Sequence, residues 1–376
     1  MKERILFTNF GEDMQLVIYG AQGYALGAYE ALKSLYPKRA VKCFLVTEMG
    51  GNAPMLGGIP VREIASYSEG VSAEERDNTE VLIATPENVQ AEIEETLESH
   101  GFRHHVRLDS ERWSELVKLY HARLGWFLPL PTLPVGCSTP FVRMYMAKSH
   151  KDRPLRQDMK LPDYIFPLQV GAAGTDTRIA GLTDDMGDNI SERNGNYSEL
   201  TGLYLIWKSK LMSEGVSDGD DGQYYGLVQY RRVLGLSDDD LLRLVDNDVD
   251  AVLPYPLPYE PNIHAHHERY LKEADWRALL TALKEIQPEY FDAFPKILEQ
   301  KYLYNYNVIL ARKRVLREYC EWLFPILLRT EELSEPKGSD RSDRYIGYIG
   351  ETLETLYFMK NADRLNEAHV GCKLLV

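Results

Sequence analysis

Residues 184–211 read DDMGDNISERNGNYSELTGLYLIWKSKL, and residues 224–234 read YYGLVQYRRVL. The first segment predicts a polar loop and then a helix, because Asn196 precedes Glu199 by the spacing of a capping box. Apolar residues then recur with helical spacing and predict one buried stripe, made of Leu200, Leu203, Tyr204, Trp207 and Leu211. The apolar run at 225–228 is too short for a helix and predicts a buried strand.

The predicted strand ends in a polar group whose chemistry suits an anion: Gln229, Tyr230, Arg231 and Arg232. In open α/β sheets, ligands bind outside the carboxyl ends of the strands. Two arginines at such an end can bind phosphate oxygens through paired hydrogen bonds. The alternative is that Arg231 and Arg232 are solvated or pair with nearby acidic side chains.

The composition is that of an ordinary globular protein, with 376 residues and 44% hydrophobic side chains. This length predicts two or three domains at about 100–200 residues each. A net charge of −14 argues against a non-specific nucleic-acid binder, because such proteins need a basic face. A nucleotide needs only a local basic pocket and stays compatible with this charge. The 24 tyrosines suit amphipathic clefts as well as cores.

The four cysteines are widely spaced and form no CxxC pair: Cys43, Cys137, Cys320 and Cys372. This spacing argues against a zinc site or a disulfide framework and fits a reducing compartment. The first residues, MKERILFTNFGEDM, carry acids where a signal peptide needs an apolar run. No stretch reaches the ~18–20 apolar residues of a membrane span. We therefore expect a cytoplasmic protein, with peripheral association at the inner face of the membrane as a further option.

Residues 14–126 alternate strand and helix patterns, which predicts a parallel sheet in a small Rossmann-like domain. The expected strands are 14–20, 41–48, 81–86 and 104–108. The expected helices are 21–36, 87–101 and 110–125. This segment is loosely similar to the Rossmann-type domain that precedes some bacterial sugar-modifying enzymes.

The first strand is followed by a GxxGxxxG pattern at Gly20, Gly23 and Gly27. It lacks the central glycine of the GxGxxG dinucleotide fingerprint. A glycine turn before a helix can still bind an anion at the helix N-terminus. A tight turn and close helix packing explain the same glycines, and we favour this structural interpretation.

Four prolines fall within residues 127–140, FLPLPTLPVGCSTP, and predict a stiff linker. The expected organisation is therefore a Rossmann-like α/β domain at 1–126, the linker at 127–140, and a second α/β domain with a mostly parallel sheet at 141–376.

The second domain opens with two predicted strands, FVRMYMA at 141–147 and DYIFPLQVGAAG at 163–174. The first is followed by polar residues: Ser149, His150 and Lys151. The second ends in small residues: Gly171, Ala172 and Ala173. Small residues at a strand end let a planar ring or a phosphate approach the backbone. The alternative for the polar residues is an ordinary exposed turn.

Two other motifs invite a metal interpretation. Asp248 and Asp250 form a DxD, which binds a metal in sugar-nucleotide enzymes, but here the pair precedes its strand and is interpreted as a turn. His264, His266 and His267 lack acidic partners at metal-ligand spacing. A histidine that contacts phosphate, such as His266, is therefore favoured over a metal ligand.

The remaining chain predicts one strand, at 306–311, which holds Asn307. It also predicts helices at 236–245, 274–285, 314–328 and 341–361. Glycines in the last helix would allow close packing near a site. Glu351 lies on that helix and is expected to be solvated, as helical glutamates usually are.

Several motifs in the second half are weak singly but specific together. They are SHK at 149–151, VGAA at 170–173, DDMGDNISERN at 184–194, SELTGLYLIWK at 198–208, YRR at 230–232, Asn307, YCEWLF at 319–324, Arg344 and GYIGE at 347–351. With these motifs, residues 141–376 resemble a family of bacterial proteins of unknown function. Its members are encoded in capsule and exopolysaccharide gene clusters and assigned to the GT-A class of glycosyltransferases. The chain departs from the family pattern at four positions: Leu205, Gln229, Val308 and Thr352.

The resemblance implies a nucleotide-sugar site. Its implied donor-binding residues are Ser149, His150, Lys151, Gly171, Ala172, Ala173, Asp185, Asn189, Tyr230, Arg231, Arg232, His266 and Asn307. Of these, Ser149, His150, Gly171 and Ala172 would lie near the nucleobase and ribose. Asp188 and Asn189 would face sugar or ribose hydroxyls.

The YRR motif stands where many GT-A enzymes have a metal-binding DxD. Guanidinium groups would then neutralise the leaving diphosphate, and no metal cofactor would be required. The alternative is a divalent ion, Mg²⁺ or Mn²⁺, held by Asp184, Asp185 or Asp188.

The sequence leaves three hypotheses about function. The first is a hexosyltransferase that moves galactose or glucose from a UDP-sugar to an oligosaccharide or lipid-linked acceptor, with Asp188 or Glu351 as the catalytic carboxylate. The second is a non-catalytic nucleotide-sugar sensor or scaffold of a polysaccharide assembly complex. The third is an NAD(P)-linked sugar oxidoreductase, against which the imperfect glycine motif counts.

Overall fold

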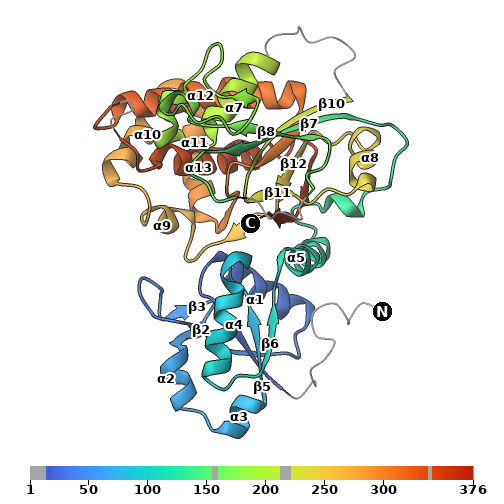
Figure 1. Cartoon of the computed structure of the whole chain (residues 1–376), viewed down its shortest axis with the longest axis vertical. Helices are drawn as coiled ribbons and strands as arrows, with labels where there is room; N and C mark the ends of the chain where they lie inside the picture. The colour runs from blue at the N-terminus through green and yellow to red at the C-terminus, as the bar shows by residue number, and fades with distance from the viewer. Residues whose placement is uncertain (1–13, 155–159, 212–221, 338–340, 376) are drawn as a thin grey trace. The chain divides into compact units, whose positions relative to one another are not determined.

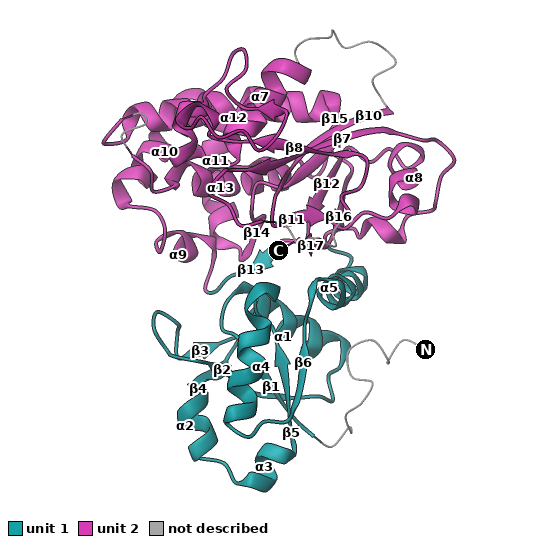
Figure 2. Ribbon diagram, viewed as in Figure 1, with its two compact units in different colours: residues 1–126, 257–260 teal, residues 127–256, 261–376 magenta. Residues whose placement is uncertain are grey.

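The computed structural model describes residues 14–154, 160–211, 222–337 and 341–375. The chain divides into two compact units (Figures 1 and 2). Unit 1 comprises residues 1–126 and 257–260, and unit 2 comprises residues 127–256 and 261–376. The acidic, glycine-rich loop between the predicted helix and strand falls largely at 212–221, outside the described residues.

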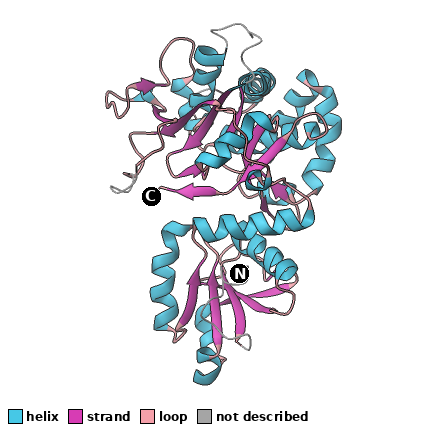
Figure 3. Ribbon diagram, turned by 90° about the vertical axis from the view of Figure 1, so that its right-hand side faces the viewer, coloured by secondary structure: helices cyan, strands magenta, loops and turns pink. Residues whose placement is uncertain are grey.

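Unit 1 is a mostly parallel sheet flanked by helices (Figure 3). Its strands are β1 Gln15–Tyr19, β2 Val41–Val46, β3 Met55–Leu56, β4 Ile59–Glu63, β5 Thr79–Ile83, β6 His104–Arg107 and β13 Leu257–Pro258. Its helices are α1 Gly23–Leu35, α2 Ile64–Glu69, α3 Ala73–Asp77, the short 3₁₀ turn η1 Glu87–Val89, α4 Gln90–Ser99 and α5 Ser110–Leu124. The sheet order is β3-β4-β2-β1-β5-β6, and only β3 is antiparallel to its neighbour.

The longer helices and the strands β1, β2, β5 and β6 of unit 1 form where the sequence patterns predict them. The β1 segment is an apolar run that becomes a buried central strand. Asp109 caps the start of helix α5, where its carboxylate accepts from the N–H of Arg112 at 2.9 Å. Gly125, with a φ of 69°, caps the end of the helix. The short elements β3, β4, α2 and α3 were not predicted, because their segments are too brief and polar to show a periodicity.

Unit 2 is built on a mixed, mostly parallel sheet, in which nine of the described strands pair. The strands of unit 2 are β7 Phe141–Lys148, β8 Ile165–Gln169, β9 Leu182–Thr183, β10 Gln223–Gln229, β11 Arg232–Leu234, β12 Ala251–Pro254, β14 Tyr302–Leu303, β15 Ile309–Arg312, β16 Glu367–Val370 and β17 Cys372–Leu374. The main order is β16-β12-β15-β10-β7-β8-β9, with β11 added to β10 and β17 to β11. An α/β fold with a mostly parallel central sheet is therefore confirmed.

Helices and short helical turns pack around this sheet. The helices are α6 Asn194–Tyr197, α7 Leu200–Ile206, α8 Asp238–Asp246, α9 Ile263–His267, α10 Glu273–Ile286, α11 Pro288–Glu299, α12 Lys313–Leu333 and α13 Tyr345–Asn361. The short turns are η2 Leu130–Thr132, η3 Ala172–Gly174, η4 Ser191–Arg193 and the π-helical η5 Trp207–Leu211.

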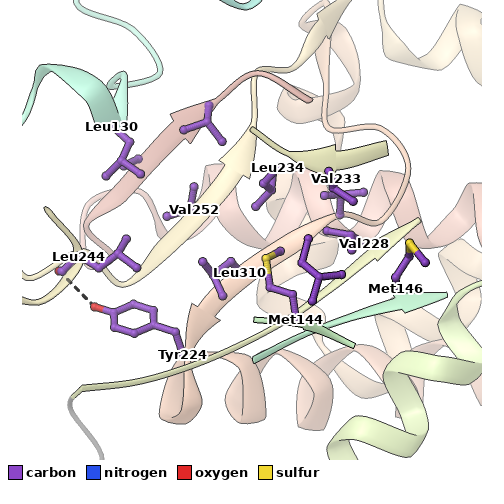
Figure 4. Close-up of a cluster of buried hydrophobic side chains, with 14 of the residues drawn as sticks. Leu130, Met144, Met146, Tyr224, Val228, Val233, Leu234, Leu244, Val252 and Leu310 are labelled. Atoms are coloured by element: carbon purple, nitrogen blue, oxygen red, sulfur yellow. Dashed lines mark hydrogen bonds between the residues drawn. The ribbon is translucent and has the colours of Figure 1, made fainter. Parts of the chain in front are cut away.

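Strand β10 lies at the centre of the unit 2 core. Gly226 on this strand leaves room for β15, since an added Cβ would lie 2.3 Å from the carbonyl oxygen of Ile309. Apolar side chains from β7, β10, β11, β12 and β15 meet Leu130 and Leu244 on one face of the sheet (Figure 4). Tyr224 places its hydroxyl 3.1 Å from the carbonyl oxygen of Leu244, so the buried polar tip is satisfied.

The predicted stripe from Leu200 to Leu211 is buried as expected, but the helix begins differently. Asn196 lies inside the separate short helix α6, and α7 begins after Glu199 without a side-chain cap. The predicted capping box is therefore wrong, because Glu199 is bound by a distant part of the chain. The strand predicted at 306–311 also begins later, at Ile309.

The proline-rich segment 127–140 packs against unit 2. Leu130 is fully buried in the core described above. The carbonyl oxygen of Leu128 accepts from the N–H of His369 at 2.7 Å, and that of Leu133 accepts from Arg243 at 2.8 Å. The prolines therefore stiffen a segment that packs on this core, which we refer to as the strap.

Candidate functional site

The strands of unit 2 bring several predicted site residues to one edge of the sheet. Strands β7, β8, β9 and β10 pair in parallel, so their carboxyl ends lie along the same edge. Strand β15 is antiparallel to β10, so Tyr306 and Asn307, which precede it, reach that edge too. We refer to this as the carboxyl edge. It carries the segments 149–151, 170–174, 184–189 and 230–232.

Asp184 anchors the small-residue loop after β8. Its buried carboxylate accepts from the backbone N–H groups of Gly171 at 2.8 Å and Ala172 at 3.0 Å. It also accepts from the hydroxyls of Thr201, at 2.6 Å, and Ser191. Four hydrogen-bond donors offset the cost of burying the Asp184 carboxylate, and its oxygens are occupied in holding the loop. Asp184 is therefore a structural anchor in this arrangement.

Gly171 is required where it stands. Its φ is 66°, and an added Cβ would lie 2.7 Å from the Oδ1 atom of Asn194. The next residue, Ala172, is buried, whereas Ala173 is exposed and its N–H donates to the Ser191 hydroxyl at 3.0 Å. The loop is thus a rigid backbone surface with one exposed small side chain.

Asp185 and Asn189 are engaged within their own loop. Asp185 accepts from the hydroxyl of Thr183 and from Arg178, whose guanidinium lies 3.0 Å away. The Asn189 amide donates to the carbonyl oxygens of Asp185 at 3.1 Å and Gly187 at 2.9 Å. These bonds shape the loop, so sugar contacts from either side chain would compete with them.

Asp188 is exposed on the same loop, and it faces helix α7. Its carboxylate accepts from the Tyr204 hydroxyl at 3.2 Å and lies 3.5 Å from the ammonium group of Lys208. About 12 Å of helix rise separates Lys208 from Leu200, where α7 begins. Since the other candidate catalytic residue, Glu351, lies near the start of α7, the structure does not bring the two candidates together.

The turn after β7 packs against Tyr230. The N–H of Ser149 donates to Asp152 at 2.7 Å, and the N–H of Lys151 lies 3.3 Å from the Ser149 hydroxyl. Burial raises the pKa of Tyr230, and the carboxylate of Asp152 raises it further. The Nδ1 atom of His150 is buried and has no hydrogen-bond partner among the described residues.

Arg231 and Arg232 lie in and beside a tight hairpin turn. Gln229 on β10 pairs with Arg232 on β11, so the turn consists of Tyr230 and Arg231. The Arg231 side chain is exposed, with its guanidinium carbon 5.3 Å from the centroid of the Tyr230 ring. The guanidinium carbon of Arg232 lies 4.0 Å from the centroid of the Tyr306 ring, a cation–π contact that orients it.

Glu199 and Glu351 form a pair of carboxylates, of which Glu351 lies within electrostatic reach of Arg232. Glu199 accepts from the amide of Asn307 at 2.7 Å. Burial raises the pKa of Glu199, while hydrogen bonds from Asn307 and Gln229 and the charge of Arg344 lower it. Glu199 therefore sits among donors that hold it in one orientation.

Glu351 is the second member of the pair, and the expectation that it is solvated is wrong. Burial raises the pKa of Glu351 to about 8, and the charge of Glu199 adds to the increase. The backbone of Tyr306, the amide of Asn305 and the charge of Arg232 act in the opposite direction. Glu351 is therefore mostly protonated at neutral pH, poised to exchange a proton.

The helix glycines make this arrangement sterically feasible. An added Cβ at Gly350 would lie 2.6 Å from the Leu200 side chain and 2.7 Å from the Oδ1 atom of Asn307. The carbonyl oxygen of Gly347 accepts from the Asn307 amide at 3.2 Å. Asn307 and Tyr306 both have positive φ, 49° and 78°. Such strain is typical of residues held in place for function.

A family model matches residues 143–362, more than half of the chain, and its description is a domain of unknown function, DUF4422. The chain belongs to the DUF4422 family. The apo structure of WbbM, a bifunctional glycosyltransferase, is similar with 26% sequence identity and a TM-score of 0.52. The similarity covers 62% of this chain and 45% of the WbbM chain, so this chain matches less than half of that protein. No curated protein matches the chain.

In the histidine cluster at 264–267, His266 and His267 are buried, and His264 lies near an acidic side chain. Burial lowers the pKa of His266 to about 4 and that of His267 to about 3. His267 shares a hydrogen bond of 2.6 Å with the Thr352 hydroxyl, and His264 lies 3.8 Å from Glu268. A neutral His266 would meet a phosphate only as a hydrogen-bonding group, without positive charge.

The described part of the DUF4422 region contains no cluster of three or more His, Cys, Asp or Glu side chains that could hold a metal ion. The DxD motif precedes β12, at the end of that strand away from the carboxyl edge. Asp248 has a φ of 52° and lies 3.2 Å from Arg312, and Asp250 pairs with Arg314. The interpretation of the DxD as a turn is confirmed. No helix within the described ranges combines the length and apolarity needed to cross a bilayer.

The glycines of unit 1 lie outside the DUF4422 match, and packing accounts for them. An added Cβ at Gly20, whose φ is 123°, would lie 2.7 Å from a backbone carbonyl oxygen. At Gly27 it would lie 2.7 Å from the Trp113 ring, and at Gly23 it would lie 3.1 Å from the side chain of Leu257. The structural interpretation of this motif is confirmed.

Sequence reasoning missed Glu199 and Asn305 as site residues. Glu199 was assigned to a capping box because its local spacing fits one, while its actual partner Asn307 is far away in sequence. The signal for Glu199 was its place in the SELTGLYLIWK motif of the family. Asn305 carried no such signal.

Proposed function

We propose that this chain transfers a hexose, galactose or glucose, from a UDP-sugar to a saccharide acceptor during synthesis of a capsular polysaccharide or exopolysaccharide. The observation that carries the proposal is the combination of guanidinium charge with partly buried carboxylates at the carboxyl edge. A nucleotide diphosphate suits the guanidinium groups, and sugar hydroxyls suit the carboxylates. The similarity to WbbM supports glycosyl transfer as the reaction class.

In this proposal, Arg231 and Arg232 bind the diphosphate of the donor. Arg231 is exposed at the turn, and Arg232 is oriented by the Tyr306 ring. Two guanidinium groups stabilise the negative charge that develops on the leaving UDP. Tyr230 supports Arg231, since its ring contacts that guanidinium group.

The nucleobase and ribose would lie on the rigid loop 171–173 and the turn 149–151. Gly171 and Ala172 are fixed by Asp184, so the backbone surface is preformed. The buried Nδ1 atom of His150 offers a hydrogen-bonding group, and Lys151 is exposed beside it. Asp188, the exposed carboxylate of its loop, would contact hydroxyls of the donor, with Asp185 and Asn189 shaping that loop.

Glu351 is the catalytic carboxylate that we favour for an inverting reaction. Such a reaction needs a base that takes the proton of the attacking acceptor hydroxyl as the bond from the sugar to UDP breaks. Glu351 lies near Arg232, on the side where the diphosphate would bind. Since its pKa is about 8, the fraction able to act as a base, and with it the rate, increases as the pH rises towards 8.

A divalent ion is not required in this proposal. Asp184 is saturated with donors, Asp185 pairs with Arg178, and Asp188 lies near Lys208. These carboxylates have separate partners and do not converge as a ligand set.

The direct test is a transfer assay with UDP-galactose and UDP-glucose and a series of oligosaccharide and lipid-linked acceptors. We expect acceptor-dependent UDP release and a glycosylated product by mass spectrometry, both unchanged by EDTA. UDP-sugar binding without turnover would favour the sensor or scaffold alternative. Absence of both binding and turnover would contradict the proposal, and loss of activity in EDTA would overturn its metal-independent form.

A further inference from the structure

Two tyrosine rings form a platform beside the buried carboxylates. Tyr270 follows helix α9, and Tyr348 lies on α13. Their ring centroids are 5.0 Å apart with an interplanar angle of 31°. His266 also contacts Tyr270, in an edge-on arrangement with ring centroids 5.2 Å apart. The three rings form one aromatic cluster, in which the His266 ring is buried.

The aromatic platform is open to solvent at Tyr270, which is 47% exposed. Its support is rigid, because His267 is buried and bonds to Thr352 on α13 at 2.6 Å. This bond ties α9 to the same helix that carries Tyr348. An exposed aromatic ring on a fixed support is a feature that binding sites use.

The aromatic platform borders the candidate catalytic carboxylate. Tyr348 and Glu351 are three positions apart on α13, so they share one helix face. Burial raises the pKa of Tyr348, the charges of Glu351 and Glu199 raise it further, and that of Arg344 lowers it. Tyr348 therefore lies within electrostatic reach of the two carboxylates and of Arg344.

This combination of groups suits one class of ligand. A pyranose ring has an apolar face of C–H groups that packs on an aromatic ring, and hydroxyls at its rim that bond to carboxylates. The phosphates of a nucleotide would instead be expected near the basic groups. The aromatic platform lies on the α9 and α13 side of Glu351, whereas the proposed base-binding turn follows β7.

We propose that Tyr270 and Tyr348 form the acceptor subsite, where an uncharged pyranosyl unit stacks on Tyr270 and directs a hydroxyl towards Glu351. The direction of transfer rests on the function proposed above, but the binding of a sugar at these rings does not. The subsite would take the acceptor and leave donor binding to the arginines.

The test is saturation-transfer NMR with methyl β-D-galactopyranoside and methyl β-D-glucopyranoside on the full chain. We expect saturation of ring protons with at least one glycoside. Tyr270→Ala should lose most of that signal, and Tyr270→Phe should keep it. The matched control is Phe141→Ala, which removes a ring that is 45% exposed at the start of β7, at the opposite edge of the sheet.

Absence of saturation with both glycosides, or an unchanged signal in Tyr270→Ala, would overturn the proposal. A titration with UDP on the same samples separates the two hypotheses. UDP binding that persists while glycoside binding fails removes the subsite only, whereas the reverse result removes the proposed function only. In the transfer assay, Tyr270→Ala should raise the KM for acceptor roughly tenfold, with the KM for donor and kcat unchanged.

Discussion

Replacing Glu351 with glutamine tests the buried carboxylate pair without any substrate. Burial raises the pKa of Glu351 from its ordinary 4.5 to about 8, and the nearby charge of Glu199 adds to this. The folded protein keeps this proton up to about pH 8, whereas the unfolded chain releases it near pH 4.5. The contribution to stability is therefore fully present below pH 4.5 and is lost as the pH rises to about 8.

The size of this effect follows from the displacement of the pKa. At about 1.36 kcal/mol per pKa unit, the loss of stability above pH 8 has an upper limit of about 5 kcal/mol. Glu351 keeps some solvent exposure, so we expect about 2 kcal/mol. Glutamine cannot ionise. Glu351→Gln should therefore exceed the wild type by about 2 kcal/mol at pH 9, or roughly 5 °C in Tm, and match it at pH 4.

The assay is thermal melting followed by circular dichroism at intervals from pH 4 to 9. The matched control is Glu367→Gln, because burial and the charge of Asp250 also raise the pKa of Glu367 to about 8. Glu367 begins β16, at the edge of the sheet away from the proposed site. Glu367→Gln should show the same gain in stability and leave the rate of sugar transfer unchanged, whereas Glu351→Gln should lower that rate at least about 100-fold. A Tm difference between Glu351→Gln and the wild type that stays constant across the pH range would refute the reasoning.

Two further substitutions test the scaffold of the site. Asp184→Asn places an amide against four donors and should lower the free energy of unfolding, measured with urea, by about 3 kcal/mol. The control, Asp185→Asn, should lower it by less than about 1 kcal/mol. Equal losses in the two variants would contradict the anchoring role of Asp184. Gly350→Ala should lower the free energy of unfolding by about 1–3 kcal/mol through its clash with Leu200 and Asn307, whereas Gly347→Ala meets its neighbour only at 3.3 Å and should be nearly neutral. A stabilising Gly350→Ala would show that this close contact is absent in solution.

The edge of the sheet where the site lies was predictable, because strands that alternate with helices in the sequence run parallel in the sheet. Apolar runs at 141–147 and 225–228 become parallel neighbours, and parallel strands place their following residues together. Arg231 and Arg232 could therefore be placed at this edge from the sequence. The hairpin that holds them could not, because β11 has only three residues and pairs locally.

The buried carboxylates were beyond prediction from local patterns. Glu199 fits a capping box by spacing, yet its partner Asn307 comes from a strained segment much later in the chain. Glu351 looks like a solvated helical residue until α7 and the loop before β15 cover it. The packing of the strap at 127–140 on the core could not be predicted for a related reason, since proline density indicates backbone stiffness and not what the backbone packs against.

Calorimetric titration of UDP tests the central claim, that guanidinium charge at the carboxyl edge binds a nucleotide diphosphate. We predict saturable binding by the wild type and at least roughly tenfold weaker binding by Arg231→Ala and Arg232→Ala, since charge-assisted bonds are each worth about 1.5–3 kcal/mol. The control is Arg314→Ala, which removes a half-exposed arginine at the other edge of the sheet and should bind as the wild type does. Equal UDP affinity in all four proteins would contradict the account.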